Sequence, residues 1–153
     1  MKKRYFYILV YASSLLMVML FDIYNLPEDI YEIVFSTKAQ TVVAKILVDM
    51  MKSENGEITK SEMSLFANRL HEGTLIEPVQ STVKLPQKEV SISYNKRQFY
   101  DRILTPMKSM GMIDYDMYKK TYKLSDKFNK AMIKIGLLWL QELKNPPGLR
   151  FKK

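Results

Sequence analysis

Apolar residues recur every three or four positions in several stretches of this chain, which predicts a mainly helical fold. A short helix is expected from about Pro27, a favoured first helical residue, to Phe35. A longer helix should follow, capped by Ser36 or Thr37, with an apolar face made of Val42, Val43, Ile46, Leu47, Met50 and Met51. Gly56, at the end of a polar run, should stop it.

The next predicted helix begins at a capping box. Thr59 and Glu62 have the required spacing, and Ile58 and Met63 stand where a hydrophobic staple would lie. This helix should continue through Phe66, Ala67 and Leu70 and end at Gly73.

A further helix is expected over residues 95–110. Asn95 can cap its first turn, and Gly111 can end it in the left-handed conformation. Its apolar face consists of Phe99, Ile103, Leu104 and Met107. Pro106 lies inside this helix, where it removes one hydrogen bond and predicts a kink.

Two short strands and a last helix should complete the chain. Residues 112–124 alternate around a lysine-tipped turn, with Tyr122 and Leu124 on one face. Ser125 is the expected cap of a helix over residues 125–144. That helix has an apolar face wider than one small domain needs, formed by Phe128, Met132, Ile135, Leu138, Trp139 and Leu143.

Residues 74–93 interrupt this regular pattern. The alternation of residues 83–85 with residues 90–92, around Pro86, Gln87 and Lys88, predicts a small β-hairpin. A connection of this length is uncommon in a compact domain. Two interpretations are open: a family-specific insertion, or an additional contact surface through Lys84 and Lys88.

Two motifs carry a resemblance to a known family. Leu104-x-x-Met107-x-x-x-Gly111-Met112-Ile113, followed by the run from Tyr122 to Phe128, resembles winged-helix transcription regulators of archaea and bacteria. The resemblance covers residues 37–143. It implies a mainly α fold with a small β-hairpin wing, a winged helix-turn-helix with extra N- and C-terminal helices. It also implies that residues 95–110 are the recognition helix and residues 112–124 the wing.

Charge favours a polyanionic partner. The 153-residue chain has 24 Lys and Arg against 16 Asp and Glu, a net charge of +8. Residues 84–130 contain eleven of these basic residues and five acidic ones. Because the basic excess coincides with the predicted helix and wing, we expect contact with double-stranded DNA. The alternative is a basic surface exposed only to solvent.

The residues expected to bind DNA come from both parts. The predicted recognition helix supplies Lys96, Arg97, Gln98, Tyr100, Arg102 and Lys108. The wing supplies Tyr118, Lys119 and Lys120. Aromatic residues interleave with these bases, so stacking on single-stranded bases is a second hypothesis for Phe99, Tyr100, Tyr115, Tyr118 and Tyr122.

The N-terminal segment, residues 1–36, admits two interpretations. Residues 5–21 carry no charge and follow Lys2, Lys3 and Arg4, as in a membrane anchor or signal peptide. Alternatively, they form a helix that pairs with the C-terminal helix in a homodimer, in a cytoplasmic protein. Residues 145–153 form a basic tail.

No arrangement in the sequence indicates catalysis, a cofactor or a metal site. The chain has no cysteine, one histidine (His71), no glycine-rich nucleotide loop and no nucleophile motif. Its composition resembles that of proteins from thermophilic archaea and their viruses. The sequence therefore predicts a DNA-binding transcription regulator. The alternatives are an interaction module in a larger assembly and a membrane-tethered regulator.

Overall fold

A computed structural model describes residues 22–77 and 90–148. The predictions for residues 5–21, for the strand at 83–85 with its turn, and for residues 149–153 lie outside the described residues.

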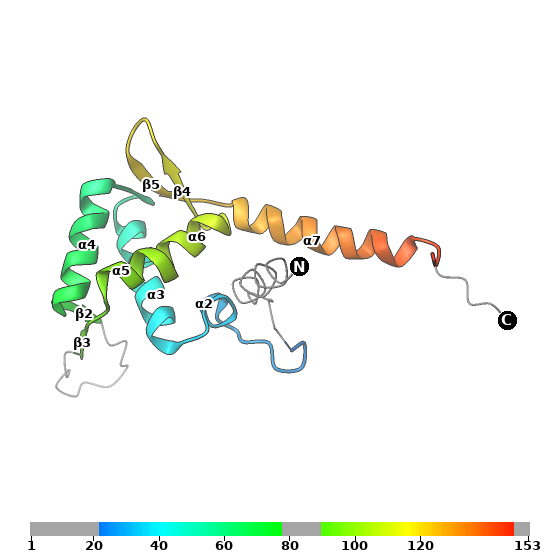
Figure 1. Cartoon of the computed structure of the whole chain (residues 1–153), viewed down its shortest axis with the longest axis horizontal. Coiled ribbons are helices and arrows are strands. Elements are labelled where there is room, and N and C mark those ends of the chain that lie inside the picture. The colour runs from blue at the N-terminus through cyan, green and yellow to red at the C-terminus, as the bar shows by residue number, and fades with distance from the viewer. Residues whose placement is uncertain (1–21, 78–89, 149–153) are drawn as a thin grey trace, which may run out of the picture. The chain divides into compact units, whose positions relative to one another are not determined.

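The described elements follow one another in the order shown in Figure 1. They are α2 (Ile30–Val34), α3 (Lys38–Ser53), β1 (Glu57–Thr59), α4 (Lys60–Glu72), β2 (Leu75–Glu77), β3 (Val90–Ile92), α5 (Lys96–Phe99), η1 (Tyr100–Leu104), α6 (Thr105–Ser109), β4 (Ile113–Asp116), β5 (Thr121–Leu124) and α7 (Lys127–Lys144). The chain divides into two units, Met1–Val42 and Val43–Lys153.

In the first unit, α2 begins later than the sequence predicts. The prediction placed its start at Pro27, but the helix starts at Ile30. The reason is a cap at Asp29, whose Oδ1 accepts a hydrogen bond from the backbone N of Tyr31 at 2.9 Å. The Thr41 hydroxyl, on the first turns of α3, donates to the Tyr31 carbonyl at 3.4 Å and joins the two helices.

Of the two candidate caps for α3, Thr37 makes the hydrogen bond. Its Oγ1 accepts from the backbone N of Gln40 at 3.3 Å. The capping box of α4 is confirmed in full, because Thr59 accepts from the backbone of Glu62 and the Glu62 side chain accepts from the backbone of Thr59. Gly73 then ends α4 in the left-handed conformation, as expected.

The second unit combines helices with a three-stranded antiparallel sheet. The strand order is β1-β5-β4, so β5 lies in the middle. Ile58 on β1 and Tyr115 on β4 both stand opposite Tyr122 on β5. The fold is therefore mainly helical with a small sheet, which agrees with the predicted class at that level.

Three helices share one apolar core with this sheet. The fully buried side chains include Val43, Leu47, Met51, Met63, Leu70, Phe99, Ile103, Met107 and Ile113. On α3 the prediction is confirmed for Val43, Leu47 and Met51, whereas Val42, Ile46 and Met50 are only half-buried. Ala44 and Val48 are buried there although the sequence analysis did not select them. Burying each large side chain contributes about 1.5–3 kcal/mol, which makes this core the main source of stability.

Within residues 74–93 the structure shows a strand pair that the sequence analysis did not predict. Residues 90–92 form a strand as expected, and β2 pairs with it, with Leu75 opposite Ile92 and Glu77 opposite Val90. The predicted pairing with residues 83–85 lies outside the described residues. The end of α4 explains the observed pair, because Gly73 turns the chain back and its carbonyl accepts a hydrogen bond from the Ser91 hydroxyl.

Candidate nucleic-acid interface

A continuous helix over residues 96–109, called the α5–α6 helix, consists of α5, η1 and α6. Asn95 caps it, with its Oδ1 accepting from the backbone N of Gln98 at 3.1 Å. One side of the helix is buried through Phe99, Ile103, Leu104 and Met107. Both the cap and the buried stripe agree with the sequence prediction.

Pro106 does not end this helix. The turn before it, Tyr100–Leu104, is a π turn, in which the backbone N of Thr105 bonds to the carbonyl of Tyr100. The helix continues past Pro106, whose own carbonyl accepts from Met110 at 2.9 Å. The hydrogen bond that Pro106 cannot make therefore coincides with a widened turn, a feature frequent at functional sites.

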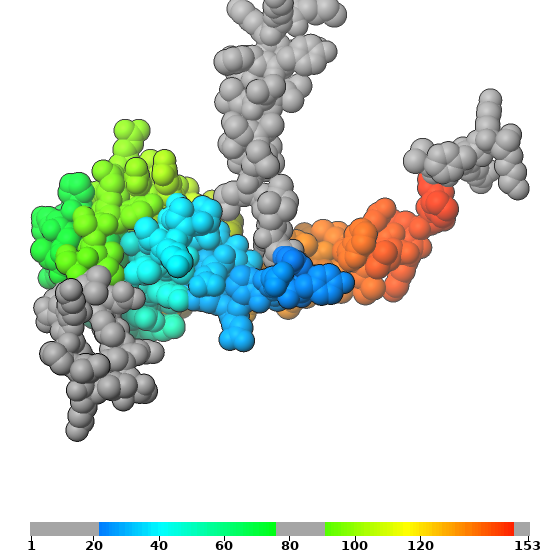
Figure 2. All heavy atoms as spheres, turned by 90° about the horizontal axis from the view of Figure 1, so that it is seen from below, coloured from blue at the N-terminus to red at the C-terminus, as the bar shows by residue number. Residues whose placement is uncertain are grey.

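The opposite side of the α5–α6 helix is polar and exposed. Its residues lie three or four positions apart and share one face: Arg97, Gln98, Asp101, Arg102, Thr105, Lys108 and Ser109. Figure 2 shows side chains of this stretch, coloured yellow-green, at the surface. Four of the six residues predicted on this helix thus lie together, namely Arg97, Gln98, Arg102 and Lys108.

The other two are less exposed and make internal contacts. The Lys96 ammonium donates to Asn68 Oδ1 on α4 at 2.6 Å. The Tyr100 ring lies edge-on to Phe99, with the ring centroids 5.3 Å apart. Lys96 and Tyr100 therefore help to seat the helix on α4 and the core.

Asp101, which the sequence interpretation left out, restrains Arg97. The Arg97 Nε lies 3.7 Å from Asp101 Oδ2, and the two side chains are 91% and 66% exposed. The i,i+4 spacing was a usable signal for this pair. Such exposed pairs contribute about 0–1 kcal/mol, so the guanidinium can exchange this carboxylate for a phosphate at little cost.

The turn between β4 and β5 is closed by one carboxylate. Asp116 Oδ1 accepts from the backbone N of Lys119 at 3.0 Å and of Tyr118 at 2.8 Å. These hydrogen bonds, first that of Lys119, hold the pKa of Asp116 below its ordinary value. Lys120 has a left-handed backbone (φ 55°), and Tyr118 is 99% exposed. The three predicted tip residues therefore project from an ordered turn.

Replacing Asp116 with Asn should keep an acceptor oxygen in this turn but remove its titration. The folded-state pKa of Asp116 is lowered, so its carboxylate stabilises the turn at pH values above the ordinary pKa of an aspartate. This stability is lost as the pH falls through the folded-state pKa. In the native chain, we expect the backbone amide NMR signals of Tyr118 and Lys119 to shift together as the pH falls through the folded-state pKa of Asp116. In Asp116→Asn, these two signals should not shift with pH.

Asp114→Asn is the matched control, because the Asp114 carboxylate pairs with Lys127 and not with the turn. It should leave the titration of both amides unchanged. The closed turn would be contradicted if the amides of Tyr118 and Lys119 titrated in the same way in Asp116→Asn as in the native chain.

Helix α4 contacts both the hairpin tip, at Lys120, and the start of the α5–α6 helix, at Lys96. The backbone N of Lys60, at the start of α4, donates to the Lys120 carbonyl at 2.9 Å. Lys96 contacts Asn68, eight residues further along. At 1.5 Å per residue the two contacts lie about 12 Å apart along α4. Lys60 is therefore a further candidate for the basic surface. Its place beside the hairpin tip follows from the pairing of β1 with β5 and could not be seen in the sequence.

Most of the interleaved aromatic rings serve in packing. Phe99 is buried against Phe66, and their ring centroids are 5.4 Å apart. Tyr122 is also buried, and its ring centroid lies 4.6 Å from that of Tyr115. Burial, followed by the charges of Tyr115 and Tyr100, raises the pKa of Tyr122. Of the five rings considered for base stacking, Tyr118 has the exposure that stacking requires.

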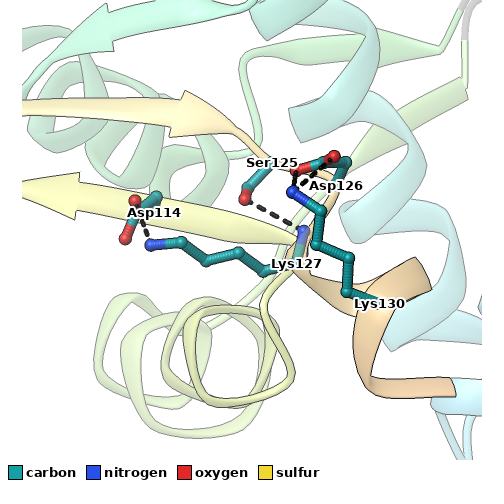
Figure 3. A network of polar contacts seen from close by, with 5 residues as sticks. All are labelled: Asp114, Ser125, Asp126, Lys127 and Lys130. Atoms are coloured by element: carbon teal, nitrogen blue, oxygen red, sulfur yellow. Dashed lines mark hydrogen bonds and ion pairs between the residues drawn. The ribbon is translucent and has the colours of Figure 1, made fainter. Parts of the chain in front are cut away.

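A polar network joins the sheet to α7 (Figure 3). The Lys127 ammonium lies 2.6 Å from Asp114 on β4, and Lys130 lies 3.0 Å from Asp126. The sequence predicted Ser125 as the cap of α7, but the cap residue is Asp126 and the helix begins at Lys127. Ser125 Oγ instead accepts from the backbone N of Lys127 at 3.2 Å, one residue before the cap position. At Tyr115, the residue after Asp114 on β4, the Lys108 ammonium lies 5.5 Å from the ring centre, a cation–π contact.

The described residues offer little beyond this basic surface. In residues 22–77 and 90–148, no group of three or more histidines and carboxylates could hold a metal ion. His71 is exposed at the end of α4. No helix within the same two stretches has the length and apolar character needed to cross a bilayer.

No protein-family model, curated protein or solved structure matches this chain.

Proposed function

We propose that this chain is a winged-helix protein that binds duplex DNA as a homodimer and regulates transcription. In this proposal α3, α4 and the α5–α6 helix are the three helices of a helix-turn-helix unit. The β4–β5 hairpin is the wing, and β1 adds a third strand to it. The observation that carries the proposal is the exposed cationic face of the α5–α6 helix. This helix directly precedes the β4–β5 hairpin in the chain.

Charge supports the same assignment. Residues 96–130 contain nine Lys and Arg and four Asp, an excess of five positive charges. Three of the aspartates pair with Arg97, Lys127 and Lys130. Lys119 and Lys120 are exposed at the hairpin tip, and Arg102 and Lys108 on the helix. Each phosphate contact from such residues releases counterions and makes the affinity depend steeply on salt.

Arg97→Ala and Lys120→Ala should weaken duplex binding in different ways. Loss of a base contact by Arg97 should cost about 1–3 kcal/mol on a selected site and relax sequence preference. Loss of a phosphate contact by Lys120 should weaken all sequences alike and reduce the salt slope by about one. Fluorescence anisotropy with a selected and a random duplex, each titrated at several salt concentrations, measures both effects.

Lys144→Ala is the control for charge alone. It removes a lysine at the far end of α7, about 26 Å along that helix from Lys127, and should leave both affinities unchanged. Equal binding by all three variants and the native chain would remove the roles assigned to Arg97 and Lys120.

A second function, as a protein-interaction module, is favoured by the exposed apolar side chains of α7. A fold alone does not give a function, and winged helices also serve in assemblies without reading DNA. Failure of the native chain to shift random duplex at low salt would select this function. The membrane-tethered form rests on residues 5–21, outside the described part, and is tested by fractionation of the expressed chain without detergent.

A further inference from the structure

The second half of α7 carries a large apolar surface that the other described residues of its own unit, Val43–Lys153, leave exposed. Phe128 and Met132, near its start, are half-buried. Further along, seven large apolar side chains are 48–65% exposed: Ile133, Ile135, Leu137, Leu138, Trp139, Leu140 and Leu143. Monomeric proteins rarely expose contiguous apolar patches larger than a few hundred Å². This part of α7 is therefore suited to a partner.

Gly136 lies at the midpoint of this helix, where glycine is unfavourable. A glycine inside a helix costs about 0.5–1 kcal/mol relative to alanine. A Cβ at Gly136 would meet nothing within 4 Å among the described residues, so the fold of the single chain does not need a glycine there. Its neighbours three and four positions away are all apolar: Met132, Ile133, Trp139 and Leu140. The glycine thus marks a place where another backbone can approach closely.

We propose that two copies of this chain pair through α7, antiparallel, and cross at Gly136. A two-fold axis at the midpoint brings the same glycine of both helices together and places Met132 opposite Leu140 of the partner subunit. Antiparallel pairing also sets the positive end of each helix dipole beside the negative end of the other. The inference takes only the dimeric state from the proposed function.

The charges on α7 favour a second copy over a lipid surface. Lys127, Lys130 and Lys134 lie about 120–180° around the helix from Gly136 at 100° per residue. In the second half of α7 the face centred on Gly136 is therefore apolar, with Lys144 at its edge, about 80° away, and the other three lysines on the far side. Four of the exposed apolar side chains, Ile133, Trp139, Leu140 and Leu143, lie within about 60° of Gly136 on the helix and belong to this face.

Sedimentation velocity of the full chain without DNA tests the pairing. The native chain should sediment as a dimer at micromolar concentration. Gly136→Phe places bulk at the crossing and should raise the dimer dissociation constant by about tenfold or more. Phenylalanine is a better helix former than glycine, so this variant should fold. Lys134→Phe adds the same side chain on the opposite side of the helix and should leave the dimer intact.

Cysteine cross-linking tests the direction of the helices, because the native chain has no cysteine. A mixture of Met132→Cys chains with Leu140→Cys chains should form a disulfide-linked heterodimer on oxidation. Ready cross-linking of either variant with itself would indicate parallel helices and overturn the arrangement.

Three other results would overturn the pairing itself. They are a monomeric native chain, a dimer unaffected by Gly136→Phe, and a monomer that binds vesicles of anionic lipid through α7. If the native chain is dimeric but does not bind duplex DNA, the proposed DNA function is wrong and the proposed α7 interface is retained.

Discussion

Replacing Gly111 with Ala should lower the free energy of unfolding by about 3 kcal/mol, the sum of two costs. Gly111 has a φ of 82°, a conformation that costs an L-residue about 1–2 kcal/mol. A Cβ there would also lie 2.8 Å from the Lys127 Cβ and 3.0 Å from the Phe128 backbone N, at the start of α7. Relieving such overpacking typically costs about 1–3 kcal/mol. Urea unfolding followed by circular dichroism measures the total.

Gly56→Ala separates the two costs. Gly56 also has a φ of 82°, but the nearest atom to its added Cβ, in Leu124, is 4.0 Å away. This variant should therefore lose only the conformational part, about 1–2 kcal/mol. Equal losses in the two variants would contradict the close packing of Gly111 against α7.

Gly111 also connects the α5–α6 helix, proposed to bind DNA, with α7, proposed to form the dimer. Its carbonyl accepts from the backbone N of Phe128 at 3.0 Å, and the Met112 carbonyl accepts from Ser125 at 3.0 Å. The end of the α5–α6 helix and the start of α7 are thereby held together by backbone contacts. Under both proposals, displacing α7 at this point would change the placement of one DNA-reading unit relative to its partner.

Local signals in the sequence predicted much of the second unit. The capping box at Thr59, the cap at Asn95 and the stops at Gly73 and Gly111 each depend on residues within one turn of the helix end. The buried stripes of α4 and the α5–α6 helix follow from periodicity, because the apolar side chains at that spacing share one face. For α3 the periodicity predicted three of the buried residues, Val43, Leu47 and Met51. These features need no knowledge of distant contacts.

Pairings between distant residues could not be predicted in the same way. The partner of β3 is decided by the reversal at Gly73, and several short apolar runs offer equivalent alternation. The contact of Lys96 with Asn68 and that of Lys60 with Lys120 depend on how α4 packs. For the candidate site, the sequence therefore predicted the residues of the helix face and the hairpin tip, but not the α4 residues that join them.

Phe99→Ala should cost about 3–5 kcal/mol of stability, the largest effect expected from a single truncation here. The Phe99 side chain is fully buried, and its ring lies 5.4 Å from that of Phe66 and 5.3 Å from that of Tyr100. A small domain has about 5–15 kcal/mol in total, so this loss would leave much of the chain near its unfolding transition. Thermal unfolding monitored by circular dichroism measures it.

Tyr118→Ala is the matched truncation of an aromatic residue that is 99% exposed. It should change stability by less than about 0.5 kcal/mol, because it leaves no cavity. Duplex binding then separates the two variants. An osmolyte such as trimethylamine N-oxide favours the folded state and should restore binding by Phe99→Ala. It should not restore binding lost in Tyr118→Ala, where a contact at the hairpin tip is missing. If the osmolyte restored the fold of Phe99→Ala but not its binding, support of the α5–α6 helix from the core would not explain the loss.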